Sequence, residues 1–368
     1  MDYKSDKRII LSLDAGGTNF DFFAVRGGEM ISKGVRLPAA ADTLEDILKM
    51  IIRGFEEVRE QAGEKAVAIS FCFPGPADFG NGIIGDLENL PLFRGGVPLK
   101  AMLEKHFGIP VYINNDGDLF TYGEAIAGLL PEVNMALESA GILRKFNNLL
   151  GVTFGTGFGG GIVRKGELFV GDNSAGAEIN RMRNKLYPQT SAEDSVTIRG
   201  IRRVFAREAG INIDDAPEPE AIYNIGIGKA EGNASAAHTA FNELAEVAGN
   251  TLADAVSLTD SLLVIGGGLA GAWPLFLPQL VQEMNRSYTE ISGAELPRME
   301  ITAYNLKDEK GFRDFLKDTS VQIQVPFSDE KVNYNPVKKI GVGISKLGTS
   351  RAVAVGAYAF ALNELSSK

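Results

Sequence analysis

The chain has 368 residues, 45% hydrophobic and 23% charged, which is the composition of a folded protein long enough for two ordinary cores. Its formal net charge of −10 argues against nucleic acid or an acidic membrane surface as the main partner. The single cysteine, Cys72, and two histidines exclude an intrachain disulfide and a cysteine zinc cluster. The first apolar run, residues 9–13, is too short for a signal sequence or a membrane span, so we expect a cytoplasmic protein.

The first part of the chain alternates between strand and helix patterns. Residues 9–13 and 20–25 have the pattern of two strands joined by a glycine turn. Residues 42–62 follow as an amphipathic helix, with Asp42 or Thr43 as a cap at its start and Gly63 at its end. The remaining expected elements are a strand at 66–73, a helix at 99–107, a strand at 110–113 and a helix at 119–130.

The second part repeats this order, with strands at 149–154 and 161–163 around a glycine turn, then helices, then a strand at 261–265. An α/β protein of two similar halves is therefore expected. The boundaries predict a small N-terminal domain over 1–123, completed by a C-terminal helix within 351–368, and a larger domain over 124–350. Residues 214–220 have the composition of a surface loop, and residues 307–335 are a polar insertion whose structure the pattern does not define.

Two stretches match the G-x-G-x-x-G pattern of dinucleotide-binding loops, one beginning at Gly155 and one at Gly266. A dinucleotide fold requires these glycines to open a helix. After Gly160, however, the sequence continues as a second strand, so the first match predicts a β-hairpin. A tight turn without a ligand is the alternative interpretation of such a loop.

Asp14-Ala15-Gly16-Gly17-Thr18 places the same strand-turn-strand arrangement in the other half, which favours a pair of phosphate-binding hairpins. Glycine lets the backbone N–H groups approach phosphate oxygens, and the Thr18 and Thr156 hydroxyls can donate to the same oxygens. Asp14 is either a turn cap or a ligand of Mg²⁺, bound directly or through water. The predicted ATP-binding residues are Asp14, Gly16, Gly17, Thr18, Gly155, Thr156 and Gly157, with Gly266, Gly267 and Gly268 at the adenosine.

The run Asn114-Asn115-Asp116-Gly117-Asp118 lies between a predicted strand and a predicted helix. A capping turn is one interpretation, because Asp116 or Asp118 could accept hydrogen bonds from the helix N-terminus. A carboxylate beside two phosphate hairpins could instead accept the proton of a substrate hydroxyl as it attacks a γ-phosphate. We predict Asp116 as this base and Asp118 as the residue better placed for the cap.

The motifs, in their order and spacing, resemble the ROK family of sugar kinases and repressors within the actin-like ATPase superfamily. The stretches that carry the resemblance are Leu13–Thr18, Phe73–Pro76, Glu88–Pro91, Val111–Asp116, Gly155–Gly161, Gly266–Gly268 and the closing Arg351–Ala357. The resemblance implies two RNase-H-like domains with an interdomain cleft, ATP with Mg²⁺, a hexose substrate, and Asp116 as catalytic base. Asn115 and Asn89 match the family's sugar-binding asparagines, and a homodimer is what the family suggests.

The chain departs from the family where a Gly-Glu-x-Gly-His motif and a cysteine cluster normally hold structural zinc. The corresponding residues are Ala177-Glu178-Ile179-Asn180-Arg181, followed by a cysteine-free stretch that ends at Glu193. Glu178 and Glu193 retain the carboxylates that would contact sugar, but the zinc ligands are absent, so we expect no structural zinc. Arg181 at the histidine position has two open interpretations, a sugar contact or an ion pair that replaces the metal in ordering the loop.

The favoured hypothesis is an ATP-dependent kinase that phosphorylates a hexose or N-acetylhexosamine hydroxyl, with sugar and ATP as its partners and no role for nucleic acid or membrane. A non-catalytic sugar-binding sensor or regulator of the same family is the alternative. The family's repressors carry an N-terminal helix-turn-helix, whereas thirteen residues precede Asp14 here, and the acidic charge opposes DNA binding.

Overall fold

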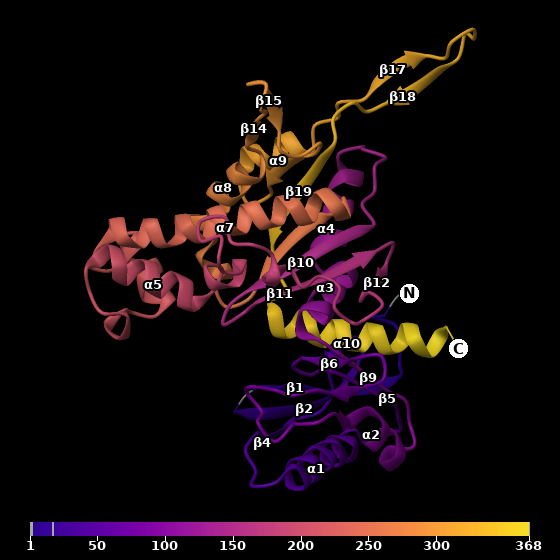
Figure 1. The fold of residues 1–368 in the computed structure, drawn as a ribbon. Coiled ribbons are helices and arrows are strands. Elements are labelled where there is room, and N and C mark those ends of the chain that lie inside the picture. Colours follow the sequence, from indigo (N-terminus) through magenta and orange to yellow (C-terminus); the bar gives the residue numbers. More distant parts are fainter. Residues whose placement is uncertain (1–2, 17, 368) are drawn as a thin grey trace. The chain divides into compact units, whose positions relative to one another are not determined.

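A computed structural model describes residues 3–16 and 18–367 of the chain. The chain divides into two compact units (Figure 1). The first comprises residues 1–128, 161–177 and 347–368, and the second comprises residues 129–160 and 178–346. In the described part of the chain, no helix is both long enough and apolar enough to cross a lipid bilayer.

The first unit is built on a mixed sheet with the strand order β3-β2-β1-β5-β9, with β4 also paired to β2. β1 is antiparallel to β2 and parallel to β5, which is in turn parallel to β9. A separate small sheet has the order β6-β7-β8. The strands are β1 (Ile9–Ala15), β2 (Asn19–Arg26), β3 (Glu29–Met30), β4 (Val35–Pro38), β5 (Ala66–Cys72), β6 (Ala77–Asp78), β7 (Ile83–Ile84), β8 (Val97–Pro98), β9 (Val111–Asn114) and β12 (Glu167–Leu168).

Helices cover both faces of this sheet, because alternate residues of its strands point to opposite sides. Ile9, Leu11 and Leu13 of β1 belong to the core under α1 (Leu44–Ala62) and α2 (Leu99–Phe107), whereas Ile10 belongs to the core under α10 (Thr349–Ser366). Figure 1 shows α1 and α2 on one side of the sheet and α10 on the other. β1 is therefore buried on both faces, which explains its continuous apolar run.

The chain's last helix packs on α3 (Asp116–Ala127) through two glycines. A Cβ atom on Gly123 would collide with the Ala352 backbone, and one on Gly356 would collide with the Leu119 backbone. The absence of side chains lets the two helix backbones touch, so the C-terminal helix becomes part of the first unit's core.

A second six-stranded sheet has the order β12-β11-β10-β13-β19-β16. Its first five strands repeat the order of β3-β2-β1-β5-β9, and its sixth strand is β16 at the end of the sheet, where the first sheet instead has β4 beside β2. The boundary of the two units falls inside β11 (Phe158–Arg164). β10, β13, β19 and β16 are mutually parallel neighbours. The other strands are β10 (Asn148–Phe154), β13 (Leu262–Gly266), β14 (Ser287–Thr289), β15 (Glu295–Pro297), β16 (Thr302–Asn305), β17 (Val321–Gln324), β18 (Lys331–Tyr334) and β19 (Lys339–Ile344).

The longest helix of the second unit, α7 (Ala234–Thr259), packs against α5 (Ile198–Ala209), α6 (Pro219–Gly226) and α8 (Trp273–Met284). The unit's other helices are α4 (Leu129–Ser139) and α9 (Glu309–Phe315). Two short antiparallel ribbons, β14–β15 and β17–β18, stand outside the six-stranded sheet.

Most expected elements are confirmed within one to three residues at their ends. α1 has Thr43 as its N-cap, where Oγ1 accepts a hydrogen bond from the Asp46 N–H, and Gly63 at its C-terminus with φ of +66°. The expected surface loop at 214–220 is partly wrong, because a 3₁₀ turn (Ile213–Asp215) and the start of α6 occupy it. The insertion at 307–335 contains α9 and the β17–β18 ribbon.

Candidate active site

The candidate catalytic residues of the first unit lie at one edge of its sheet. Asp14 of β1 is paired in register with Cys72 of β5, and Cys72 is paired with Asn114 of β9. These three strands are parallel, so their carboxyl ends meet at the same edge, where ligands of α/β folds commonly bind. Asp14 and the segment that follows Asn114, which carries Asn115 and Asp116, are thereby brought to a common edge.

The turn between β1 and β2 has a tight backbone. The Gly16 N–H donates to the Asn19 carbonyl at 3.0 Å, and a Cβ on Gly16 would lie 3.0 Å from that same oxygen. Thr18 is exposed, and its hydroxyl oxygen accepts a hydrogen bond from Asn19 Nδ2 at 3.2 Å. Gly17, predicted as part of this phosphate loop, lies outside the described residues. The turn is a β-hairpin, as expected.

Negative charge accumulates at this edge. The pKa of Asp14 is raised, chiefly because the surrounding protein limits the hydration of its carboxylate, and further because the Asp21 and Asp116 carboxylates are near. The pKa of the buried Cys72 thiol is also raised, by burial first and then by Asp14 and Asp116. Asp14 and Asp116 therefore lie near each other and near Cys72. A bound cation would reduce the repulsion between the two carboxylates.

α3 begins at Asp116, three residues earlier than predicted, which changes the capping assignment. Its N-cap is Asn115, whose Oδ1 accepts the Asp118 N–H at 2.6 Å, so the expectation that Asp118 serves as the cap is wrong. Asp118 is instead buried in the helix, at 3% exposure. Asp116 is exposed, and its Oδ1 accepts the N–H of the neighbouring Gly117 at 2.9 Å. Of the two acids, Asp116 is the one that solvent or a ligand can reach.

Asn89 is exposed on a loop of the first unit that is closed at its base. The Arg94 guanidinium donates to the Leu87 and Phe93 carbonyls, and the Gly95 N–H donates to Asp86. Leu87 and Leu90 anchor the loop in the core. Within the described residues, no hydrogen bond joins Asn89 to Asp14 or Asp116, so its place in a sugar site stays a prediction.

In the second unit, two glycine loops lie side by side. β10 and β13 are parallel neighbours, with Thr153 paired to Gly266, so Gly155–Gly157 and Gly266–Gly268 follow adjacent strand ends. The Leu269 N–H donates to the Phe154 carbonyl at 2.9 Å, and a Cβ on Gly155 would lie 3.8 Å from the Gly268 nitrogen. The structure thus brings together the two loops that were assigned to phosphate and adenosine.

Glu193 is attached to the first of these loops. Its Oε2 accepts a hydrogen bond from the Phe158 N–H at 3.1 Å and would lie 3.3 Å from a Cβ on Gly157. The Ile198 N–H also donates to the Gly155 carbonyl at 2.9 Å. The segment that leads into α5 is therefore fastened to the glycine hairpin, and the half-buried Glu193 carboxylate is held at the end of that hairpin.

Glu178 precedes a short 3₁₀ turn (Ile179–Arg181) and Arg181 ends it, and both residues are exposed. The Arg181 N–H donates to the Glu178 carbonyl and to Asn180 Oδ1, and no ion pair to its guanidinium is found among residues 3–16 and 18–367. The interpretation of Arg181 as an ion pair that orders the loop in place of zinc is therefore not supported. Its guanidinium remains available to a ligand.

Asn184 is the residue that orders this loop, and the sequence analysis missed it. Its fully buried Oδ1 accepts the N–H groups of Leu186 and Tyr187, both at 3.0 Å, while Nδ2 donates to Ser195 Oγ and to the Ser191 carbonyl. One amide side chain thus ties both arms of the loop together. No local pattern marks a single asparagine for this role.

The next residue, Lys185, anchors the loop to the helices below it. Its Nζ lies 2.8 Å from Glu246 of α7 and 2.7 Å from Glu283 of α8. Glu283 is 1% exposed and is also paired with Arg286 and Arg298. The buried carboxylate is thus neutralised by three cations, as burial of a charge requires.

The donor set suits Mg²⁺ held jointly with a ligand better than an all-protein metal cage. In the part of the chain that the structure describes, no group of three or more histidine, cysteine or acidic side chains could enclose a metal. Mg²⁺ is commonly bound by one or two carboxylates together with substrate phosphates and waters. The Asp14 carboxylate, exposed beside Asp116, fits that coordination.

The fold and these two sets of glycine loops define a mixed α/β protein of the actin-like ATPase type, as predicted. The ROK family profile matches residues 10–313, and the chain belongs to the ROK family. A crystal structure of a glucokinase from Parabacteroides distasonis is similar, with a TM-score of 0.91 and 50% identity over 99% of both chains.

Two curated relatives have lower identity. The chain is 32% identical over 174 residues to a glucokinase of Thermotoga maritima, covering 47% of this chain and 50% of that protein. It is 30% identical over 172 residues to an N-acetyl-D-glucosamine kinase of Vibrio cholerae, covering 46% of this chain and 51% of that protein. The chain thus spans about half the length of these two relatives. The family resemblance inferred from the motifs is confirmed.

Proposed function

We propose that the protein is an ATP-dependent sugar kinase that phosphorylates a hydroxyl of a hexose or N-acetylhexosamine. The observation that carries the proposal is 50% identity, over 99% of both chains, to a protein described as a glucokinase. The placement of the acids supports it, because Asp116 is exposed at the carboxyl edge of the sheet while Asp118 is buried.

In this proposal Asp116 is the general base. Its carboxylate accepts the proton of the sugar hydroxyl while the hydroxyl oxygen attacks the γ-phosphorus and the bond to the ADP oxygen breaks. The products are a sugar phosphate and ADP, and the proton passes from Asp116 to solvent. Asn89, Asn115, Glu178, Arg181 and Glu193 are proposed to contact the sugar. With its Oδ1 committed to the helix cap, Asn115 would act as a donor through Nδ2.

The glycine loops are proposed to hold the nucleotide. The first unit supplies Asp14, Gly16, Gly17 and Thr18, and the second supplies Gly155, Thr156 and Gly157 to the phosphates and Gly266–Gly268 to the adenosine. Asp14 would hold Mg²⁺, which when bound neutralises charge on the phosphates. The protein is further proposed to act in the cytoplasm, as a homodimer, without structural zinc.

The test is ADP release from Mg-ATP with glucose, fructose, N-acetylglucosamine and N-acetylmannosamine, one sugar at a time. Asp116→Asn should reduce sugar-dependent turnover by about 10²–10⁴-fold. Asp42→Asn, which removes the same charge from an exposed aspartate of the same unit, should not change it. If a sugar raises the thermal midpoint of both the wild type and Asp116→Asn but neither turns over ATP, the kinase hypothesis is refuted and the non-catalytic sensor is supported.

A further inference from the structure

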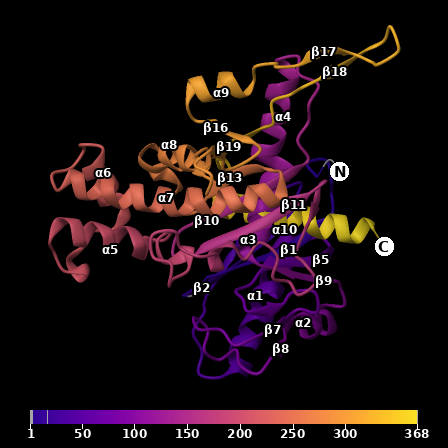
Figure 2. The same cartoon turned by 45° about the horizontal axis from the view of Figure 1, so that its top comes forward.

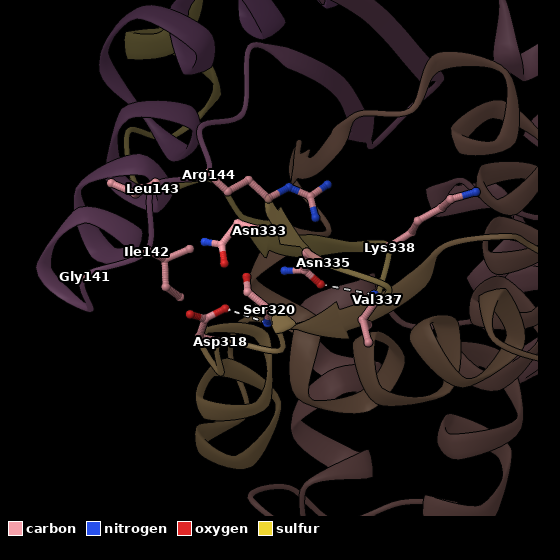
Figure 3. A pocket seen from close by; sticks show the side chains of 10 residues that line it. All are labelled: Gly141, Ile142, Leu143, Arg144, Asp318, Ser320, Asn333, Asn335, Val337 and Lys338. Atoms are coloured by element: carbon pink, nitrogen blue, oxygen red, sulfur yellow. Dashed lines mark hydrogen bonds between the residues drawn. The ribbon is translucent and has the colours of Figure 1, made fainter. Parts of the chain in front are cut away.

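The β17–β18 ribbon has a polar pocket at its root, hereafter the root pocket, with a volume of about 450 Å³. It lies between residues 141–144, which follow α4, and residues 318–320 and 333–338 of the ribbon's root, and Figures 1 and 2 show these segments side by side. Figure 3 shows the polar side chains of both segments around the pocket. Ligand pockets of proteins have volumes of about 300–1,000 Å³. All lining residues belong to the second unit and none is in a glycine loop, so the root pocket shares no residue with the candidate active site.

The Arg144 guanidinium in this pocket is held in place but has no anionic partner. Its carbon lies 4.7 Å from the centre of the Phe146 ring. Phe146 is itself fixed, because the Asn134 amide pairs with its N–H and its carbonyl at 2.8 and 2.9 Å, and its ring is stacked on that of Phe315. Across the described ranges 3–16 and 18–367, no ion pair or hydrogen bond to the guanidinium is found. A guanidinium stacked on an aromatic ring keeps its edge N–H groups free, and these suit bidentate binding of an oxyanion.

Two asparagines of the lining present donors to the same pocket. The Asn335 Oδ1 accepts hydrogen bonds from the Thr319 hydroxyl at 2.7 Å and from the Val337 N–H at 3.1 Å. Because a backbone N–H can only donate, the atom that it contacts is oxygen, and Nδ2 is the group that remains for a ligand. Figure 3 shows this nitrogen turned away from Val337. Asn333 is arranged in the same way, since its Oδ1 accepts a hydrogen bond from Gln322 Nε2 at 2.6 Å. The lining therefore offers a guanidinium and two amide N–H donors whose oxygens are already used.

The charge at the root pocket is positive, although the whole chain carries a net charge of −10. Lys339 is 3% exposed, and its pKa is lowered first by burial and then by the nearby Arg144 cation, whereas Asp318 raises it. Two positive charges and one negative charge are therefore close together. Lys338, which also lines the pocket, is already paired with Glu300 at 3.1 Å. An anion that binds beside Arg144 is attracted by the excess positive charge.

The rest of the lining suits the body of an organic ligand that carries hydroxyl groups. Ile142, Leu143 and Val337 supply apolar atoms. Asp318 Oδ1 accepts the Ser320 N–H at 2.9 Å, and hydrogen bonds from Ser320 hold the pKa of Asp318 below its ordinary value. The Asp318 carboxylate therefore stays ionised at neutral pH, and as an acceptor it can bind hydroxyl groups. A bare inorganic anion would use the donors of the pocket but neither this acceptor nor the apolar atoms.

We propose that the root pocket is a second ligand site, which reversibly binds a phosphate monoester carrying hydroxyl groups, such as a sugar phosphate. The phosphate oxygens accept hydrogen bonds from Arg144, Asn333 and Asn335, the ligand hydroxyls donate to Asp318, and the carbon skeleton packs on the apolar lining. The ribbon side of this site lies beyond residue 313, where the family match ends. A sugar phosphate is also the product of the proposed reaction, but the site is argued from its own donors and charges and does not depend on that reaction.

Isothermal titration calorimetry of the full chain with glucose 6-phosphate tests the proposal. Asn335→Asp keeps an oxygen for the Thr319 hydroxyl and the Val337 N–H but replaces the amide donor by a carboxylate, so the pocket stays folded while binding should weaken by at least about 10-fold. Arg144→Gln removes the guanidinium and should weaken binding by about 10–100-fold. Glucose, which lacks the phosphate, should not distinguish these two variants from the wild type.

Two variants of the same loop are matched controls for the changes in charge. Asn147→Asp adds a negative charge and Lys145→Gln removes a positive one, at exposed residues that do not line the pocket, so both should bind glucose 6-phosphate as the wild type does. A wild type that does not bind this ligand, or binding that is equal in the wild type, Asn335→Asp and Arg144→Gln, would overturn the proposal. Inorganic phosphate that binds the wild type as tightly as glucose 6-phosphate would also overturn it, because the site would then take a free anion.

Discussion

Replacing Gly267 by alanine tests the close approach of the two glycine loops in the second unit. Gly267 has φ of +88°, and a Cβ there would lie 2.6 Å from the Phe154 nitrogen, 2.7 Å from its carbonyl carbon and closer still to its oxygen. The left-handed backbone costs an alanine about 1–2 kcal/mol. Overpacking against a backbone that is fixed in a central strand costs about 1–3 kcal/mol more. We expect Gly267→Ala to lower the free energy of unfolding by about 2–5 kcal/mol.

Urea unfolding followed by tryptophan fluorescence measures this decrease in the free energy of unfolding within the second unit. The chain's one tryptophan, Trp273, begins α8 shortly after the glycine loop, so its emission reports on the second unit. Gly268→Ala is the matched control, because a Cβ there meets no atom within 4 Å, and its stability should change by less than about 0.5 kcal/mol. Equal losses in the two variants, or a neutral Gly267→Ala, would refute the packing argument.

Three further variants test the electrostatics and the loop that Asn184 orders. Asp14→Asn should raise the free energy of unfolding at neutral pH, and with it the thermal midpoint, while weakening Mg-ATP binding. The gain in free energy should be less than about 1 kcal/mol because the carboxylate is exposed. The pKa of Asp14 is raised in the folded state, so its ionised carboxylate destabilises the fold at neutral pH. Protonation removes this destabilisation, so the thermal midpoints of variant and wild type should converge as the pH falls to about 4. A difference between the midpoints that does not change with pH would contradict this reasoning. Asn184→Ala leaves buried N–H groups without acceptors and should cost about 2–4 kcal/mol in chemical denaturation; a neutral effect would mean that the loop is ordered by other contacts. Glu283→Gln should cost about 3 kcal/mol with little dependence on salt, and a loss that vanishes at high salt would mean that the group is exposed.

Several features follow from the sequence alone because they depend on local patterns. Buried strands, the capped helix α1 and the difference between a glycine hairpin and a helix-opening glycine loop are set by hydrophobic period, turn residues and caps within a few positions. The order and spacing of the glycine and aspartate motifs were also sufficient to predict the ROK family and the α/β fold.

Tertiary structure decided which of two nearby acids is exposed. Asp116 and Asp118 are two residues apart on one helix, so no local pattern tells which is exposed and which is buried. Their exposure depends on the packing of α3 against α10, more than 200 residues later in the chain.

Long-range contacts also decided the features that local reasoning left open. The pairing of Asp14 with Cys72 and of Thr153 with Gly266 is a matter of strand register, which depends on partners far along the chain. Asn184 organises its loop through contacts with both arms, Leu186 and Tyr187 on one side and Ser191 and Ser195 on the other, which no pattern around a single asparagine reveals. Local patterns therefore determined the elements and the family of this protein, and tertiary packing decided which polar side chains face solvent, since burial depends on what other segments bring to the same place.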